Sequence, residues 1–147
     1  MRAVARTSVV AGLVAATFLL GTGAAEAAGA TKEVAFKNAF GDCNVGATVG
    51  ATTDSFAIIN FPSNGTVSAT IKLKKLDANT TYQVRLVQTP NGLGGNCGAV
   101  DTTLTTNSQG NGTTHWSEAR DTTTTGVFVL LEGGTQGFLA TDGVLDS

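Results

Sequence analysis

The chain has 147 residues, with 9 Lys and Arg against 11 Asp and Glu and a single His. This length allows one ordinary domain, and a net charge of −2 excludes binding driven by nucleic-acid phosphates. One His and two Cys leave the usual four-ligand zinc site incomplete. We therefore expect no nucleic-acid partner, no metal and no cofactor.

The first 27 residues have the pattern of a cleaved secretory signal peptide. Arg2 and Arg6 precede an uncharged, largely apolar run over residues 8–20, and small residues surround the expected cleavage point after Ala27. Cleavage after Ala30 is the alternative. The apolar run is shorter than the roughly 20 residues that span a bilayer, so a retained anchor is the weaker interpretation. We expect a secreted, extracellular protein with no membrane attachment, whose domain comprises residues 28–147.

Both cysteines lie in the exported part of the chain. Cleavage also removes two Arg and one Glu, which leaves 7 basic and 10 acidic side chains and a mildly acidic protein. Since thiols oxidise outside the cell, we predict a disulfide between Cys43 and Cys97. It would close a loop of about 54 residues and stabilise the fold by roughly 4 kcal/mol. The alternative, a reactive or metal-binding thiol pair, has neither a CxxC partner nor an adjacent base.

The exported part carries the periodicity of strands and no credible helix. Residues 67–74 alternate between apolar and polar side chains without a break, the period of a half-buried strand. Residues 127–131 are apolar on both sides, which predicts a central strand covered on both faces. Other predicted strands are 33–40, 55–61, 82–86, 102–106, 113–118 and 136–141. We therefore expect an all-β domain with seven to eight short strands.

Turn residues separate these segments. Residues 107–112, Asn-Ser-Gln-Gly-Asn-Gly, give the best hairpin signal because Asn and Gly tolerate positive φ. A group of basic residues, Lys72, Lys74, Lys75 and Arg85, is expected on the wet face of adjacent strands. A solvated face that discourages edge pairing explains this group without a binding role.

The stretch from Leu76 to Tyr82 is similar to the tyrosine corner of immunoglobulin-like and fibronectin type III domains, in which a Leu precedes the corner Tyr by six residues. Together with residues 104–112, it resembles small secreted immunoglobulin-like proteins of actinobacteria. The resemblance implies a single immunoglobulin-like Greek-key β-sandwich and no particular activity. Val84 stands where an immunoglobulin domain has its second cysteine, so a transthyretin-like or other Greek-key sandwich is an open alternative.

No catalytic motif is present, and we predict no catalytic residue. His115 is the only imidazole, and a Ser-His-Asp arrangement would have to combine it with a Ser and an Asp that no spacing selects. The G-x-S-x-G elbow and the spacing of a calcium loop are both missing.

The pair His115-Trp116 is the first candidate for binding. In a strand, neighbouring side chains point to opposite faces, so one of the two faces outward. An outward Trp116 would offer a flat aromatic surface to a sugar ring, whereas an inward one would belong to the core. Leu93, in a glycine-rich loop near Cys97, is the second candidate.

These features predict a non-enzymatic, monomeric binding protein or cell-surface-associated module. Its partner would be an unknown protein or a cell-wall carbohydrate. The alternative is a small secreted inhibitor that inserts the Cys97 loop, which begins at Thr89 and ends at Val100. A loop ordered in advance by a disulfide loses less entropy on binding.

Overall fold

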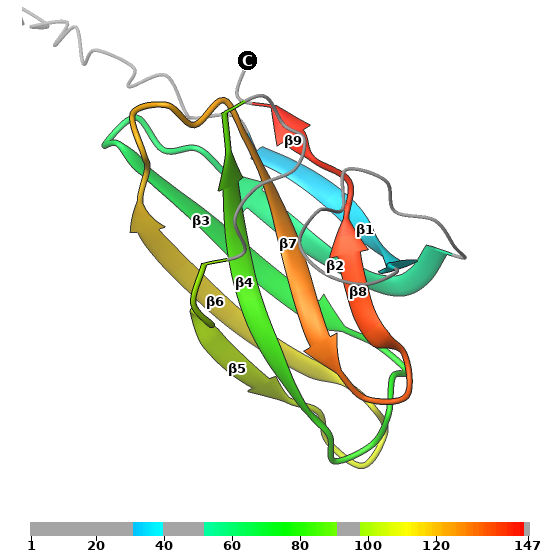
Figure 1. The fold of residues 1–147 in the computed structure, drawn as a ribbon. Helices are drawn as coiled ribbons and strands as arrows, with labels where there is room; N and C mark the ends of the chain where they lie inside the picture. Colours follow the sequence, from blue (N-terminus) through cyan, green and yellow to red (C-terminus); the bar gives the residue numbers. More distant parts are fainter. Residues whose placement is uncertain (1–30, 40–51, 91–97, 146–147) are drawn as a thin grey trace, which may run out of the picture.

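The computed structural model describes residues 31–39, 52–90 and 98–145, which form nine β-strands (Figure 1). These are β1 (Thr31–Ala39), β2 (Thr52–Asn60), β3 (Thr66–Leu73), β4 (Thr81–Thr89), β5 (Thr102–Thr105), β6 (Gly112–Ala119), β7 (Gly126–Gly133), β8 (Gly137–Thr141) and β9 (Val144–Leu145). This part of the chain is all-β, as predicted. None of its segments is a helix long and apolar enough to cross a membrane.

The eight predicted strands are confirmed, each within three residues at either end. The short strand β9 was not predicted, because two residues are too few to display a period. Alternation along β3 places Val67, Ala69, Ile71 and Leu73 in the core, all with 2% exposure or less. The periodicity of this segment therefore correctly predicted which side chains face inward.

Strands β1 to β8 form one antiparallel sheet in the order β5-β4-β7-β8-β1-β2-β3-β6, and β9 pairs with β7. The first part of β1 pairs with β2 and residues 36–39 pair with β8, with a register shift between Ala35 and Lys37. Strands β5, β4, β7 and β8 form one half of this sheet, and β1, β2, β3 and β6 form the other. Figure 1 shows the two halves lying face to face, and side chains from both halves form one core. The sheet is therefore nearly closed, and its end strands β5 and β6 meet on the open side.

Strand β7 is covered on both faces, which confirms the prediction from its composition. Val127, Val129 and Leu131 belong to the main core between the two halves. Phe128 and Leu130 point the other way and form a second buried cluster with Ala39, Val87 and Ala140. All five of these β7 side chains are at most 1% exposed.

The predicted hairpin at residues 107–112 is wrong, although the turn itself is present. Asn107 Oδ1 accepts the N–H groups of Gln109 and Asn111, both at 3.0 Å, and Gly110 has a φ of 74°. The turn connects β5 to β6, but β5 pairs with β4 and β6 pairs with β3 along its whole length. The chain thus crosses from one half of the sheet to the other instead of doubling back, because each strand has a longer-range partner.

The Leu76–Tyr82 corner carries the chain from β3 to β4. Tyr82 is fully buried, its hydroxyl donates to Gln136 Oε1 at 3.3 Å, and Leu76 packs against the core. Burial raises the pKa of the Tyr82 phenol, although a hydrogen bond from the Asp77 backbone opposes the rise. The strand order differs from that of immunoglobulin constant domains, in which the second and third strands lie in opposite sheets, because β2 and β3 are paired here.

We expect Tyr82→Phe to cost about 1 kcal/mol at neutral pH, because it removes the buried hydroxyl and leaves Gln136 without its donor. The raised folded-state pKa has a second effect. Its stabilisation is present below the usual tyrosine pKa of about 10 and is lost as pH rises through the folded-state pKa. Between about pH 8 and about pH 11, the free energy of unfolding measured in urea should therefore fall in the wild type and should fall less in Tyr82→Phe. An equal loss in both proteins would contradict this, and since Tyr82 is the only tyrosine its titration can be followed by phenolate absorbance.

On the open side, one side chain connects the two halves of the sheet. Gln88, from β4, donates to Glu118 Oε1 at 2.6 Å and to the Ala119 carbonyl at 2.9 Å. Its Oε1 accepts the Asp121 N–H at 2.8 Å and the Thr124 hydroxyl at 3.0 Å. We call this arrangement the Gln88 bridge. It links β4 to β6 beyond the end of the short strand β5, where no backbone ladder connects them.

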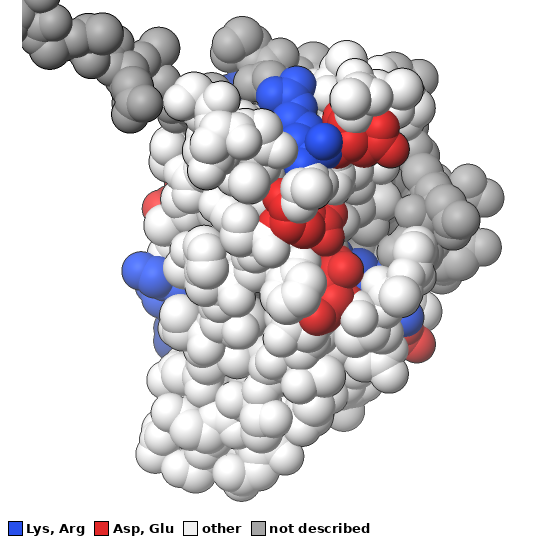
Figure 2. Space-filling model, turned by 90° about the vertical axis from the view of Figure 1, so that its left-hand side faces the viewer, with Lys and Arg blue, Asp and Glu red and all other residues white. Residues whose placement is uncertain are grey.

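Asp101 caps the exposed edge of β4 beside the Gln88 bridge. Its Oδ2 accepts the Leu86 N–H at 2.6 Å, and its own N–H donates to the Val84 carbonyl at 2.9 Å. Burial raises the pKa of the Asp101 carboxyl and the charge of Glu118 raises it further, while the Leu86 N–H lowers it. Figure 2 looks onto this side of the molecule, where acidic side chains gather in the middle of the face.

Candidate functional site

A groove of about 490 Å³ lies where β3 ends and β6 begins. Its volume is within the range of small-ligand sites, and three lysines stand among its lining residues. We call it the lysine groove and define it by Lys72, Leu73, Lys74, Lys75, Asn107, Asn111, Gly112 and Thr113. It is therefore built from the end of β3, the residues that follow it and the turn before β6.

The first two lysines lie over the same aromatic ring. Lys72 and Lys74 alternate with the buried Leu73 and so point to the outer face of the sheet. Phe56, opposite Lys72 in β2, lies beneath both, with its ring centroid 5.6 Å from Lys72 Nζ and 5.1 Å from Lys74 Nζ. The negative face of the ring attracts both ammonium groups, which favours two neighbouring positive charges.

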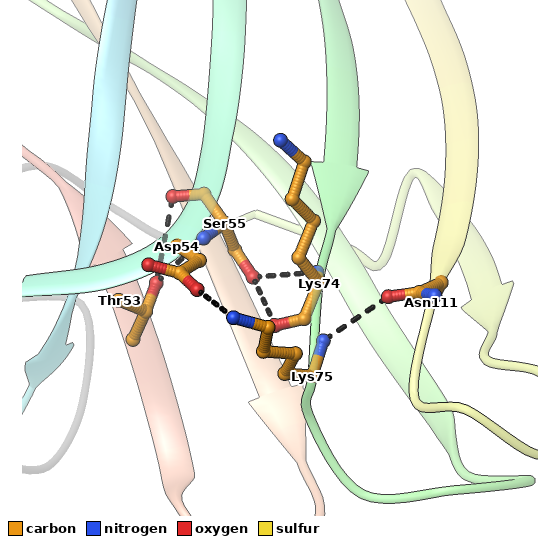
Figure 3. Close-up of polar contacts among 6 residues, drawn as sticks. All are labelled: Thr53, Asp54, Ser55, Lys74, Lys75 and Asn111. Atoms are coloured by element: carbon orange, nitrogen blue, oxygen red, sulfur yellow. Dashed lines mark hydrogen bonds and ion pairs between the residues drawn. The ribbon is translucent and has the colours of Figure 1, made fainter.

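Lys75 has a backbone conformation that side-chain-bearing residues rarely adopt. Its φ is 53°, in the left-handed region that glycine or asparagine would occupy at lower cost. Its N–H donates to Asn111 Oδ1 at 3.2 Å, and its Nζ lies 2.9 Å from Asp54 Oδ2 (Figure 3). A hydrogen bond and the charge of Lys75 lower the pKa of Asp54, and the same contacts raise the pKa of Lys75.

The start of β2 is anchored to the end of β3, which places Asp54 beside the lysines. Ser55 is buried, and its Oγ accepts the Lys74 N–H at 2.9 Å and donates to the Lys74 carbonyl at 3.4 Å. Thr53 Oγ1 accepts the Ser55 N–H at 3.1 Å and donates to the Phe36 carbonyl at 3.0 Å. Figure 3 shows Asp54 between these two anchors, with its carboxylate pointing at Lys75.

The two asparagines of the groove can donate hydrogen bonds to a ligand. Asn107 Oδ1 is occupied by two backbone N–H groups, and Asn111 Oδ1 by the N–H of Lys75. These contacts assign the amide oxygens, so each NH₂ group remains available as a donor. Within the described part of the chain, neither NH₂ group donates a hydrogen bond. The groove therefore presents ammonium and amide donors and suits a ligand rich in negatively charged acceptors.

Trp116 and His115 do not form one surface. Trp116 is half-buried, packs against the core and donates from Nε1 to Glu118 Oε2 at 3.1 Å. His115 is exposed on the opposite face of β6, with Nδ1 3.1 Å from Thr70 Oγ1. The inward alternative for Trp116 thus describes its position.

The remaining sequence candidates lie outside the lysine groove or outside the described residues. Leu93, Cys43 and Cys97 are in the second category, so the disulfide and the role of the Cys97 loop stay predictions. Within the described ranges, no three His, Cys, Asp or Glu side chains are grouped so as to hold a metal ion. The sequence also missed Asp54 and Phe56, whose contribution depends on how β2 and β3 are aligned.

The predicted basic group is only partly correct. Lys72, Lys74 and Lys75 are together, but Arg85 belongs to β4 in the other half of the sheet. Its Nη1 contacts Glu132 Oε2 at 2.9 Å and its Nη2 donates to Gln83 Oε1 at 3.2 Å. Among the described residues, Lys72 and Lys74 have no carboxylate within ion-pair distance.

Comparisons with known proteins leave the site to be interpreted from its own chemistry. No protein-family model, no curated protein and no solved structure matches the chain.

Proposed function

We propose that this chain is a secreted, non-enzymatic binding protein whose lysine groove holds an acidic carbohydrate of the cell surface. The observation that carries the proposal is the set of ammonium and amide donors in the groove, among them two lysines that have no described carboxylate within ion-pair distance. Such a lining attracts carboxylate, sulfate or phosphate groups.

The pattern of residues 1–27 supports secretion, and an extracellular location would bring the groove to wall polymers. The proposal includes a disulfide between Cys43 and Cys97 and a monomeric, immunoglobulin-like Greek-key sandwich. The geometry of the Leu76–Tyr82 corner favours that kinship, although the pairing of β2 with β3 is a departure from it.

The double variant Lys72→Gln/Lys74→Gln tests the proposal. With polygalacturonate as a defined acidic carbohydrate, we expect it to weaken binding about tenfold, since two charge contacts of under 1 kcal/mol each are lost. Wild-type binding should also weaken as salt screens the charges. Titration calorimetry at two salt concentrations measures both effects.

Two controls complete this experiment. Lys32→Gln removes one charge from an exposed position in β1, away from the groove, as Lys72→Gln alone removes one from the groove, and it should leave binding within about twofold of wild type. Dextran, a neutral polysaccharide, should not bind. Equal losses for Lys32→Gln and Lys72→Gln would mean that only the net charge matters and would overturn the groove as the site.

A further inference from the structure

A carboxylate lies beside the lysine groove, next to Lys75. Asp54 Oδ2 lies 2.9 Å from Lys75 Nζ, and the charge of Lys74 also acts on Asp54. The carboxylate thus stands at the place where an anionic group of a ligand would meet Lys75. Lys72 and Lys74, by contrast, lie over the ring of Phe56.

The fold gives no reason for this pair. The side chains of Lys75 and Asp54 are 80% and 62% exposed, and ion pairs at such exposure add little to stability. Lys75 additionally occupies a left-handed conformation that a glycine would adopt more readily. Residues held in costly conformations cluster at functional sites, and here the cost keeps a lysine at the rim of the groove.

Asp54 is well placed but easily moved aside. Its neighbours Thr53 and Ser55 fix the backbone on both sides, so the carboxylate is always close to Lys75. Its side chain is exposed, and its only hydrogen bond to another side chain among the described residues goes to Lys75. A free single anion competes poorly with a carboxylate held at high effective concentration. An anionic group tethered to one already bound at Lys72 and Lys74 competes on equal terms.

We propose that Asp54 is a built-in counter-ion that a ligand displaces from Lys75, so that the groove takes ligands with at least two linked anionic groups. This inference rests on the proposed function and specifies its ligand class as a polyanion with repeated charges. In the complex, one anionic group pairs with Lys72 and Lys74 and a second one pairs with Lys75, while Asp54 turns into solvent.

The variant Asp54→Asn tests this inference, because the inference predicts tighter ligand binding and the alternative predicts weaker binding. With trigalacturonate as the probe, we expect it to bind about threefold more tightly than the wild type, because no internal anion has to be displaced. For monogalacturonate we expect a smaller gain. If Asp54 instead positions Lys75 for the ligand, Asp54→Asn will bind trigalacturonate more weakly, which would overturn the inference.

Lys75→Gln is the matched variant. It should weaken trigalacturonate binding, and adding Asp54→Asn to it should restore much less than the gain seen in the wild-type background. An unchanged gain would show that Asp54 acts through general charge and not through Lys75, which would also overturn the inference. Urea unfolding of each variant checks that the fold is retained.

The two hypotheses fail in different ways. If the wild type does not bind trigalacturonate, or if Lys72→Gln/Lys74→Gln binds it equally well, the proposed function fails. If Lys72→Gln/Lys74→Gln weakens binding but Asp54→Asn leaves affinity unchanged or reduced, only the inference about Asp54 as a counter-ion fails.

Discussion

Replacing Gly110 with alanine is expected to lower the free energy of unfolding by about 3 kcal/mol or more. A Cβ atom at this position would overlap the backbone carbonyl of Leu76, and the residue has a φ of 74°. Gly110 accepts the Leu76 N–H at 3.1 Å, so the turn and the corner are packed backbone to backbone. Neither backbone can move without breaking this contact, and the clash cannot be relieved by rotating a side chain.

Gly65→Ala is the matched control for this prediction. Gly65 has nearly the same φ, 76°, but no atom lies within 4 Å of a Cβ built there. It should cost only the left-handed penalty of about 1 kcal/mol. Urea unfolding of the two variants therefore separates the conformational penalty from the clash, and equal costs would show that the corner and turn adapt. Gly110→Ala should also reduce polygalacturonate binding, because the turn supplies Asn107 and Asn111 to the groove.

The second large effect is expected for Gln88→Ala, which removes all four hydrogen bonds of the Gln88 bridge. We expect a loss of about 2 to 3 kcal/mol, because the half-buried Glu118 carboxylate and the Asp121 N–H lose partners. Trp116 would remain a donor to Glu118, so the carboxylate would not be left entirely unpaired. The change in the urea midpoint at constant slope measures the loss.

Gln83→Ala is the control for the bridge, because Gln83 is an exposed glutamine on the same strand whose side chain accepts a hydrogen bond from Arg85. It should change stability by less than about 0.5 kcal/mol. A similar small change for Gln88→Ala would mean that water replaces the bridge without cost and that the open side holds together through the core alone.

Local patterns predicted the strands well because burial repeats along each strand. The unbroken alternation of residues 67–74 correctly predicted a strand with one solvent-exposed face. The apolar run of residues 127–131 correctly predicted a strand with both faces buried. Such patterns describe a strand's own faces, however, and contain no information about its neighbour. The turn at residues 107–112 therefore suggested a hairpin, whereas β6 in fact pairs with β3.

The candidate site was harder to predict for the same reason. The lysines were visible in the sequence, but the groove depends on Asp54 and Phe56 from β2 and on two asparagines more than 30 residues away from Lys75. Their proximity follows from the register of β2 against β3 and from the docking of the turn on the corner. Trp116 was the more conspicuous residue, yet its side chain contributes to the interior.

The position of β1 between the two halves has a consequence for behaviour at high concentration. Because β1 pairs with β2 on one side and β8 on the other, the described sheet ends at β5 and β6, apart from the two-residue β9 that pairs with β7. β5 has four residues, and the edge of β4 beyond it is capped by Asp101. Open edges are where chains associate into fibrils, and short or capped edges offer little template for this. We therefore expect the β4–β5 edge to be a poor template for amyloid-like assembly, which leaves the eight-residue β6 as the longer edge through which chains could associate.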